Sequence, residues 1–295
     1  MKRCEEWIVA YRQRLDPYLL PDDPSRPFTV IPNTWRYWCA DPHLLEHQGQ
    51  TYVFAELYDR VLRRGVIGYC QLTDHGPTSW KVALKNATHL SYPQIFVDNG
   101  SIYMIPESCA QREIAVYRAV SFPNCWEKCH ILKGHCVAVD STFFTHNDIS
   151  WMQTLEYVND RPAFRLYRLQ GGVPAVQSLL LSENDEHVRP GGSLFVHQEK
   201  LIRPAQDCTE SYGCALNIYQ VNELSTDAYG EELLTRITPS RIRSDLRGDP
   251  QGIHTYNISS KYEVIDLKQY KIDLLSYIMR PVWSVWYRVR KLLRR

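Results

Sequence analysis

A repeat of about 50 residues constrains the fold of this chain more than any other feature of its sequence. The five copies begin 51, 48, 49 and 65 residues apart, at the anchor residues Asp41, Tyr92, Asp140, Arg189 and His254. A turn follows each of the first three anchors after eight residues, and strand-like segments flank each turn. This pattern is typical of propeller blades. We therefore predict an all-β fold, a five-bladed β-propeller.

The propeller is predicted to occupy residues 1–270. Within it, residues 1–37 contain a strand-like segment, Trp7–Tyr11, and then a connector that carries five prolines. The segment has no partner strand nearby in the sequence, so we expect it to complete the last blade and close the ring. The longest spacing, between the fourth and fifth copies, reflects an additional stretch at Leu224–Gly252.

Residues 271–295 break the repeat. From Leu274 to Arg295 the chain has no acidic residue, and six lysines or arginines alternate with tryptophan, tyrosine, valine and leucine. This composition predicts an amphipathic basic helix. We expect Arg280–Arg295 to bind the surface of an anionic membrane. The alternative is a helix that packs on the propeller with its basic face in solvent.

Charge and termini restrict the class of protein. The net charge of +1 gives no support to a nucleic-acid partner. The N-terminus leads into no apolar run of signal-peptide length, and no segment approaches the length of a membrane span. We therefore expect a cytoplasmic protein that is peripheral to the inner face of the membrane.

The nine cysteines are scattered, and no CxxC pair occurs. A metal cluster could be drawn from Cys125, Cys129, His130 and His135, but the histidine pair lacks the spacing of a zinc site. Reduced thiols are the favoured interpretation. The sequence assigns no metal ligands and leaves metal dependence open, and the expected small-molecule partner is a nucleotide-sugar donor that acts as substrate.

The anchors are the first candidates for chemistry, because innermost propeller strands begin at one mouth of the central channel. Asp41 and Asp140 could act as base, nucleophile or stabiliser of a positively charged sugar. Arg189 suits a phosphate or carboxylate. Glu107 ends the second strand of its blade and either reaches the channel as an acid or pairs with an arginine.

A second group of candidates follows the fourth anchor. The segment Arg203–Cys208 is the densest polar cluster in a strand-like region, and Tyr212 comes shortly after it. Polar side chains beside strand ends bind a ligand or bond a loop, and we favour binding. The candidate substrate-binding residues are Tyr92, Arg189, Arg203, Gln206, Asp207, Tyr212 and His254; for His254 a purely structural role is an open alternative.

Eight ordered motifs carry a family resemblance: Ala40-Asp41-Pro42, Tyr92-Pro93, Pro106-Glu107, Val139-Asp140-Ser141-Thr142, Arg189-Pro190-Gly191-Gly192, Arg203-Pro204-Ala205-Gln206-Asp207-Cys208, Tyr212-Gly213 and His254-Thr255. Over residues 5–268 the chain resembles the N-terminal domain of plant glucosamine inositolphosphorylceramide transferase and its stand-alone bacterial relatives. The resemblance implies a five-bladed propeller related to furanosidase-type glycosidases such as glycoside hydrolase family 43. In plants the domain is joined to a separate glycosyltransferase domain, so the resemblance does not by itself transfer the activity.

The comparison with those glycosidases separates two functions. They use an aspartate base from the first blade, a second aspartate from the third and a glutamic acid from the start of the fourth. Asp41 and Asp140 match the aspartates, but Arg189 stands at the fourth position. An arginine does not donate a proton at neutral pH, whereas it suits a nucleotide diphosphate, which leaves as an anion.

We therefore predict a glycosyltransferase that moves a sugar from an activated donor to a glycan or lipid-linked acceptor in cell-surface polysaccharide or glycolipid synthesis. Asp41 or Asp140 would be the base, Arg189 and Arg203 would bind the donor phosphates, and Gln206, Asp207 and His254 would position sugar hydroxyls. Two alternatives stay open. Glu107 could supply the missing acid of a furanosidase-like glycoside hydrolase, or the chain could be a non-catalytic sugar-binding module.

Overall fold

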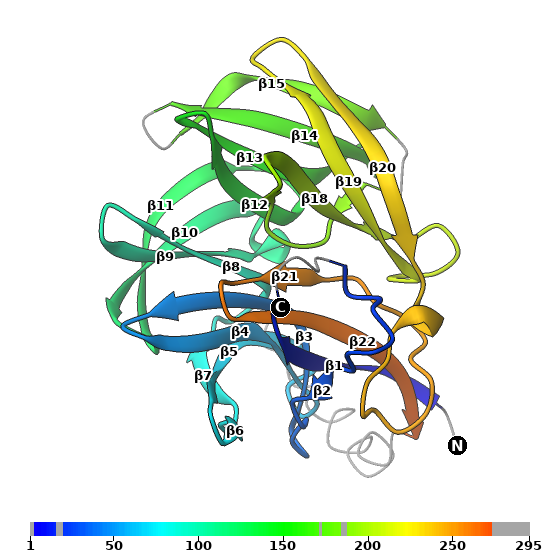
Figure 1. The fold of residues 1–295 in the computed structure, drawn as a ribbon. Coiled ribbons are helices and arrows are strands. Elements are labelled where there is room, and N and C mark those ends of the chain that lie inside the picture. Colours follow the sequence, from blue (N-terminus) through cyan, green and yellow to red (C-terminus); the bar gives the residue numbers. More distant parts are fainter. Residues whose placement is uncertain (1–2, 16–19, 171–172, 184–187, 273–295) are drawn as a thin grey trace.

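The computed structural model describes residues 3–15, 20–170, 173–183 and 188–272, which form five antiparallel sheets around a central axis (Figure 1). Each sheet is one blade, and consecutive blades follow one another along the chain. The prediction of an all-β, five-bladed propeller is confirmed. The helices within the described residues are two short 3-10 turns, η1 (Cys109–Gln111) and η2 (Pro239–Arg241).

The blades contain four or five strands each. Blade 1 consists of β3 (Tyr37–His47), β4 (Gln50–Asp59), β5 (Arg64–Thr73), β6 (Gly76–Pro77) and β7 (Lys81–Leu84). Blade 2 consists of β8 (Ser91–Asp98), β9 (Ser101–Glu107), β10 (Glu113–Ser121) and β11 (Cys125–Gly134). Blade 3 consists of β12 (Ala138–His146), β13 (Ile149–Val158), β14 (Arg161–Gln170) and β15 (Val173–Glu183).

The last two blades depart from this plan. Blade 4 consists of β16 (Arg189–Pro190), β17 (Phe195–His197), β18 (Lys200–Asp207), β19 (Ala215–Leu224) and β20 (Tyr229–Ile237). Blade 5 joins both ends of the described chain: β21 (Tyr256–Ile258) pairs with β22 (Tyr262–Ile272), β22 pairs with β1 (Arg3–Gln13), and β2 (Thr29–Val30) lies outermost. The additional stretch Leu224–Gly252 contains β20 and η2.

Strand β1 closes the ring. It pairs with β22 along its whole length, from Arg3 opposite Ile272 to Gln13 opposite Tyr262. The strand expected at Trp7–Tyr11 is therefore longer than predicted at both ends. Four consecutive residues, Trp7 to Ala10, are buried because β1 is covered on both faces. Ring closure also places the beginning of β1 beside the channel mouth, where it contributes to the site described below.

The repeat is visible in the backbone of the first three anchors. Asp41, Tyr92 and Asp140 have φ values of 53°, 42° and 51°, in the left-handed region that non-glycine residues rarely adopt. Each stands at a bulge between the first and second strands of its blade. A bulge redirects side chains and is frequent beside active sites. In blade 4 the positive φ is instead at Gly192, at 144°.

Side chains from neighbouring blades fasten the ring at the axis. The Gln94 amide of blade 2 donates to the Phe143 carbonyl and accepts from the Phe143 N–H of blade 3, both at 2.6 Å. Asn257 of blade 5 donates to the Pro42 carbonyl and accepts from the Ser193 N–H, both at 2.7 Å. These bonds satisfy backbone groups that the blades leave unpaired and hold the inner strands in fixed positions.

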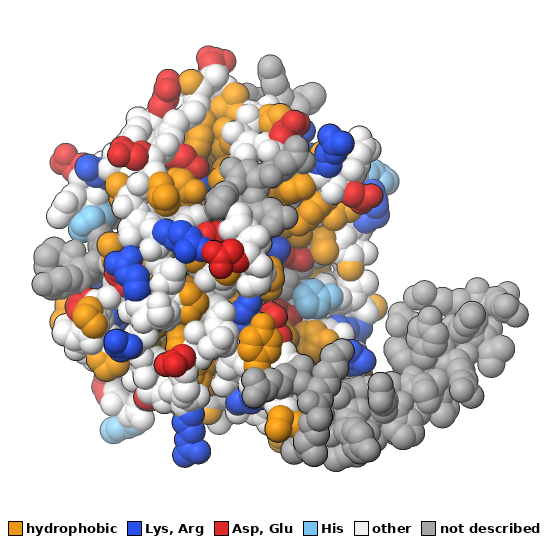
Figure 2. Space-filling view, turned by 90° about the vertical axis from the view of Figure 1, so that its right-hand side faces the viewer, with side chains coloured by type: hydrophobic (Ala, Val, Ile, Leu, Met, Phe, Trp, Pro, Cys, Tyr) orange, Lys and Arg blue, Asp and Glu red, His pale blue; other side chains and the backbone are white. Residues whose placement is uncertain are grey.

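The predicted basic helix at 271–295 lies almost entirely outside the described residues. Its first two residues, Lys271 and Ile272, are described and form the end of β22. Within the described part of the chain, no helix has the length and apolar character that crossing a bilayer requires. On the face shown in Figure 2, acidic, basic and apolar side chains are interspersed. This mixture agrees with the nearly neutral net charge.

Candidate active site

A cavity of about 410 Å³ opens at the axis, where the innermost strands begin. Blades 1 and 2 supply its walls from β3, the ends of β4 and β9 and the start of β8, while β16 and β1 complete the opposite side. Half of the ten candidate residues line it: Asp41, Glu107, Arg189, Tyr212 and His254. The topology thus brings together side chains that are more than 200 residues apart in the sequence, such as Asp41 and His254.

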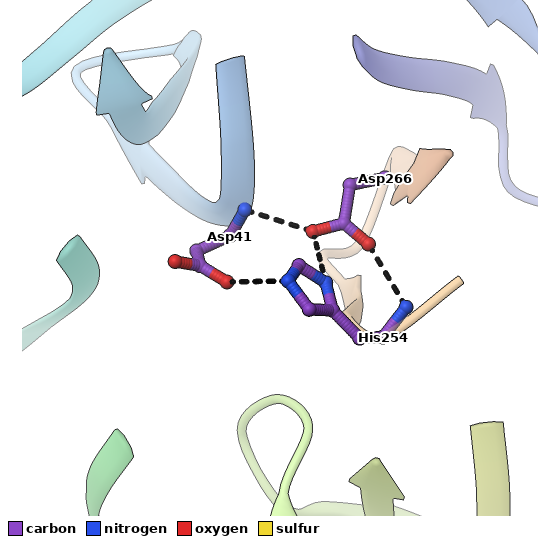
Figure 3. A group of neighbouring side chains, drawn as sticks. All are labelled: Asp41, His254 and Asp266. Atoms are coloured by element: carbon purple, nitrogen blue, oxygen red, sulfur yellow. Dashed lines mark hydrogen bonds and ion pairs between the residues drawn. The ribbon is translucent and has the colours of Figure 1, made fainter. Parts of the chain in front are cut away.

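Asp41, His254 and Asp266 form a buried hydrogen-bonded row (Figure 3). His254 Nδ1 lies 2.7 Å from Asp266 Oδ2, and His254 Nε2 lies 3.5 Å from Asp41 Oδ1. The imidazole stacks on the Trp7 ring, with centroids 3.8 Å apart. Burial alone would lower the pKa of His254, but the Asp266 carboxylate outweighs it and raises that pKa. The raised pKa favours the charged form of His254, whose Nε2 faces Asp41.

Asp41 has the properties of a base. Burial raises the pKa of its carboxyl group to about 6, although His254 opposes this shift. The Tyr92 N–H and the Thr255 hydroxyl donate to its two oxygens, at 3.1 Å and 3.3 Å. These bonds fix the carboxyl group, and a pKa near the operating pH lets an ionised Asp41 accept a proton efficiently at neutral pH.

The same row could suggest a cation site, since its ligand atoms lie within 4.8 Å of one another. Asp266, however, already accepts the backbone N–H groups of Asp41, His254 and Thr255, at 2.8, 3.1 and 2.9 Å, as well as the imidazole. The Asp266 carboxylate therefore has hydrogen-bond partners for both of its oxygens without a bound cation. Within the described chain, Cys125, Cys129, His130 and His135 do not form a group of three or more metal ligands.

A second buried cluster surrounds Asp140 beside the cavity. Asp140 Oδ2 accepts from Arg189 Nε at 2.5 Å and from Gln206 Nε2 at 2.6 Å. Arg189 Nη2 also lies 3.7 Å from Glu107 Oε2. The Arg189 charge is thus compensated by Asp140, while Glu107 lies beside it. Asp140 lies behind Arg189 rather than in the cavity wall.

Glu107 has the properties of an acid. Burial and the negative charge of Asp140 raise the pKa of its carboxyl group to about 8, against the opposing effect of Arg189. Glu107 is therefore mainly protonated at neutral pH, while Asp41 is mainly ionised. Two carboxyl groups with pKa values separated in this way are the usual arrangement of an acid and a base in one site.

Arg203 corrects one prediction. Its guanidinium is fully buried between blades 3 and 4, with the Phe164 and Tyr219 rings each 4.7 Å from it. It pairs with Glu231 at 2.5 Å and donates to the Val188 carbonyl at 3.1 Å. Arg203 does not reach the cavity, so its position argues against the predicted contact with donor phosphates.

Three other candidates also lie outside the cavity. Asp207 accepts from Arg236 at 2.6 Å and from the Thr209 hydroxyl at 2.6 Å, and these bonds outweigh burial and lower its pKa to about 2. The buried Gln206 amide donates to Asp140 at 2.6 Å and to the Pro190 carbonyl at 2.7 Å. The buried Tyr92 hydroxyl contacts Thr142 and accepts the Gly192 N–H at 2.8 Å, so it fastens blades 2, 3 and 4. Their positions indicate structural roles instead of the predicted contacts with sugar hydroxyls.

Several residues of the site escaped the sequence analysis: Trp7, Trp38, Glu56, Tyr58, His89 and Asp266. For Glu56 a signal was present, because it precedes Glu107 by 51 residues, the same interval as between Asp41 and Tyr92. Both glutamates pair with the residue that precedes their anchor. Asp266 carried no such signal, and Trp7 reaches the site only through ring closure.

Comparison with known sequences gives a consistent set of relatives. A sequence profile described as the N-terminal part of glucosamine inositolphosphorylceramide transferase 1 matches residues 33–245. The protein of that name from Arabidopsis thaliana is 32% identical over 206 residues, which are 65% of this chain and 26% of the relative. The protein from Oryza sativa subsp. indica is 30% identical over 206 residues, 65% of this chain and 27% of the relative. The chain thus matches about a quarter of the length of these curated relatives.

Solved structures share the fold. An α-L-arabinofuranosidase from Podospora anserina in complex with cellotriose superposes with a TM-score of 0.58 at 9% identity, over 78% of this chain and 90% of that one. A family-43 β-xylosidase/α-arabinofuranosidase from a compost metagenome gives a TM-score of 0.58 at 10% identity, over 81% and 92%. At these identities the likeness establishes the five-bladed architecture alone.

Proposed function

The chain belongs to the family defined by the N-terminal domain of glucosamine inositolphosphorylceramide transferase 1, and we propose that it is a carbohydrate-active enzyme. Its cavity acts on a glycosidic bond by acid–base chemistry. The observation that carries this proposal is the position, in one cavity, of two buried carboxyl groups, Glu107 and Asp41, whose surroundings raise their pKa values to about 8 and about 6. The relatives' name alone does not carry it, because the chain matches only a quarter of their length.

The proposed reaction assigns one proton transfer to each carboxyl group. Glu107 donates its proton to the oxygen that leaves the anomeric carbon, and Asp41 accepts a proton from the hydroxyl that attacks it. One carbon–oxygen bond breaks and another forms, so the sugar passes from one oxygen to the other. Of the two aspartates predicted as base, Asp41 is favoured, because Asp140 is occupied by Arg189 and Gln206.

We propose that the attacking group is a hydroxyl of a membrane-linked glycan or lipid, which makes the reaction a glycosyl transfer. The transferase name of the relatives supports this choice. The donor that we favour differs from the predicted nucleotide sugar. Arg189 is neutralised by Asp140, and the Arg60 guanidinium in the cavity wall pairs with Glu6 at 2.8 Å. A leaving oxygen that takes a proton from Glu107 suits these groups better than a diphosphate does.

Hydrolysis is the second candidate, and Glu107 favours it specifically. The absence of a glutamic acid at the fourth anchor was the main sequence argument against a hydrolase, and Glu107 supplies a proton donor from blade 2 instead. The two reactions differ only in whether water or an acceptor hydroxyl attacks. A sugar-binding module without turnover is the third possibility.

Incubation of the purified chain with a panel of aryl glycosides separates these functions. We expect release of the aryl group, and a sugar–acceptor product by mass spectrometry when an alcohol acceptor is added. Free sugar at every acceptor concentration would establish the hydrolase. No release of any aryl group from the panel would contradict both enzymatic proposals and leave the binding module.

The pH dependence of kcat/KM should be bell-shaped, with limbs near pH 6 and pH 8. Below about pH 6 Asp41 is protonated and no longer accepts a proton, and above about pH 8 Glu107 has lost the proton that it donates. Because the two carboxyl groups interact, the apparent pKa values of the two limbs are properties of the pair. Rates measured from pH 4 to pH 10 check this prediction, and activity that rises steadily to pH 10 would contradict it.

We also propose that residues 280–295 bring the chain to the inner face of the membrane. Their six basic residues and interleaved tryptophans support binding to anionic lipid. Deletion of residues 277–295 should reduce sedimentation with phosphatidylserine vesicles at least roughly ten-fold at low salt, since each basic residue near the surface contributes about 1 kcal/mol. The matched control replaces the six bases by glutamine. Equal sedimentation of the full chain and the deletion would refute this role.

A further inference from the structure

One polar group in the cavity has no function in the proposed reaction. Glu56, on β4, is 6% exposed and lines the cavity wall next to blade 2. Its Oε1 atom has no hydrogen-bond partner among the described residues and lies 3.5 Å from His89 Nε2. A buried carboxyl oxygen without a partner costs free energy unless a ligand or water completes it.

The structure around Glu56 is adapted to this pair. The Gly65 N–H donates to His89 Nδ1 at 2.9 Å, so the neutral imidazole carries its proton on Nε2, toward Glu56. A Cβ atom at Gly65 would lie 2.4 Å from Glu56 Oε1 and 2.3 Å from the Leu90 carbonyl oxygen. Gly65 is not one of the glycines with a positive φ. Glycine is therefore required here by the lack of room for a Cβ atom and not by the backbone conformation.

The charge state of the pair selects the type of ligand. Burial and the nearby carboxylates raise the pKa of Glu56 well above its usual value, and burial lowers the pKa of His89. These shifts favour the uncharged forms of the two groups, a carboxylic acid and an imidazole N–H. Such groups form hydrogen bonds with hydroxyls and give no compensation to a phosphate or a carboxylate.

An aromatic pair lies beside them. Trp38 and Tyr58 are opposite each other on β3 and β4, and their rings stack with centroids 4.6 Å apart and planes inclined by 10°. Both line the cavity, and Tyr58 is directly opposite Gly65 in the sheet. Flat aromatic faces bind the apolar face of a sugar ring.

We propose that Glu56, His89, Trp38 and Tyr58 form a second saccharide subsite, which holds a neutral, hydroxyl-rich ring next to the one attacked at Asp41 and Glu107. This inference rests on the proposed function, because that function decides which of the two rings is attacked and which is only bound. The substrate class that it predicts is a neutral glycoside of at least two rings. Glu56 and His89 exchange hydrogen bonds with hydroxyls of the second ring, and the Trp38–Tyr58 pair packs against the apolar face of that ring.

A saccharide array tests the subsite without any turnover. The full chain carrying Glu107→Gln is applied to methyl glycosides, their neutral di- and trisaccharides, sugar phosphates and uronates. We expect a neutral disaccharide to bind roughly ten-fold more tightly than its methyl monosaccharide. Added Glu56→Leu should remove this preference and leave monosaccharide binding within about two-fold, while Glu56→Gln, which keeps a donor and an acceptor, should retain it.

The controls separate the outcomes. Trp35→Ala, which changes a ring that is 74% exposed and outside the cavity lining, should leave the preference intact. If Glu56→Leu lowers the melting temperature, His89→Asn serves as the test variant instead. The His89 side chain is 38% exposed, so this change should disturb folding less. The subsite is overturned if Glu56→Leu weakens both ligands equally or neither, if anionic sugars bind more tightly than neutral ones, or if no saccharide binds. Failure of the catalytic proposal appears separately, as absent turnover in the wild type.

Discussion

Glu107→Gln should lower kcat about a thousand-fold for substrates with poor leaving groups, within the range of 10²–10⁴ that general acid catalysis contributes. The amide has nearly the shape of the protonated carboxyl group, so binding and folding should change little, but it has no proton to transfer. The alkaline limb of the pH profile near pH 8 should disappear in the variant, because it reports the ionisation of Glu107.

The matched control is Glu127→Gln, which changes a half-exposed glutamate on β11, far from the cavity lining. It should leave kcat and the pH profile unchanged. A Glu107→Gln enzyme with wild-type kcat and an intact alkaline limb would contradict the assignment of the acid. A loss of binding for all saccharides together with a lowered melting temperature would show that Glu107 is a structural residue.

Arg203→Ala should lower the free energy of unfolding by about 3–5 kcal/mol, the usual cost of removing one partner of a buried ion pair. The change leaves Glu231 without its bidentate partner and opens a space between the Phe164 and Tyr219 rings. Denaturant unfolding measures the loss. The control Arg118→Ala breaks the exposed pair with Glu127 and should cost no more than about 1 kcal/mol.

The same variant distinguishes the structural role of Arg203 from the predicted contact with donor phosphates. If Arg203→Ala unfolds at the same denaturant concentration as Arg118→Ala but loses turnover, the arginine acts on substrate and the structural role is refuted. A destabilised protein with normal kcat in its folded fraction agrees with the structure.

The ring and the position of its anchors were predictable from the sequence, because the repeat fixes both. The bulge with a left-handed residue occurs at Asp41, Tyr92 and Asp140, at equivalent places in three blades. The end of β9 was likewise predictable, and Glu107 reaches the cavity from there. Its role was not, since its protonation depends on burial and on Asp140 of another blade.

The candidates that missed the cavity share a physical reason. Successive residues of a strand point to opposite faces, and the Arg203–Cys208 cluster therefore divides between different surroundings. Arg203 meets rings from β14 and β19, and Asp207 meets Arg236 from β20. These partners lie on the third and fourth strands of blades 3 and 4, and their positions beside β18 follow from tertiary packing. The strand β20 lacks a clear alternation of apolar residues, and the sequence therefore predicts no element within the additional stretch Leu224–Gly252.

The dependence of the Glu107→Gln defect on the leaving group tests the central claim most directly. A 2,4-dinitrophenyl group leaves as a stable anion and needs no proton, whereas an alkyl group or an unactivated phenyl group does. We predict a loss of about a thousand-fold with the poor leaving group that shrinks to within about ten-fold with dinitrophenyl. An equal loss with both leaving groups, or no release of either by the wild-type chain, would contradict acid–base chemistry at Glu107 and Asp41.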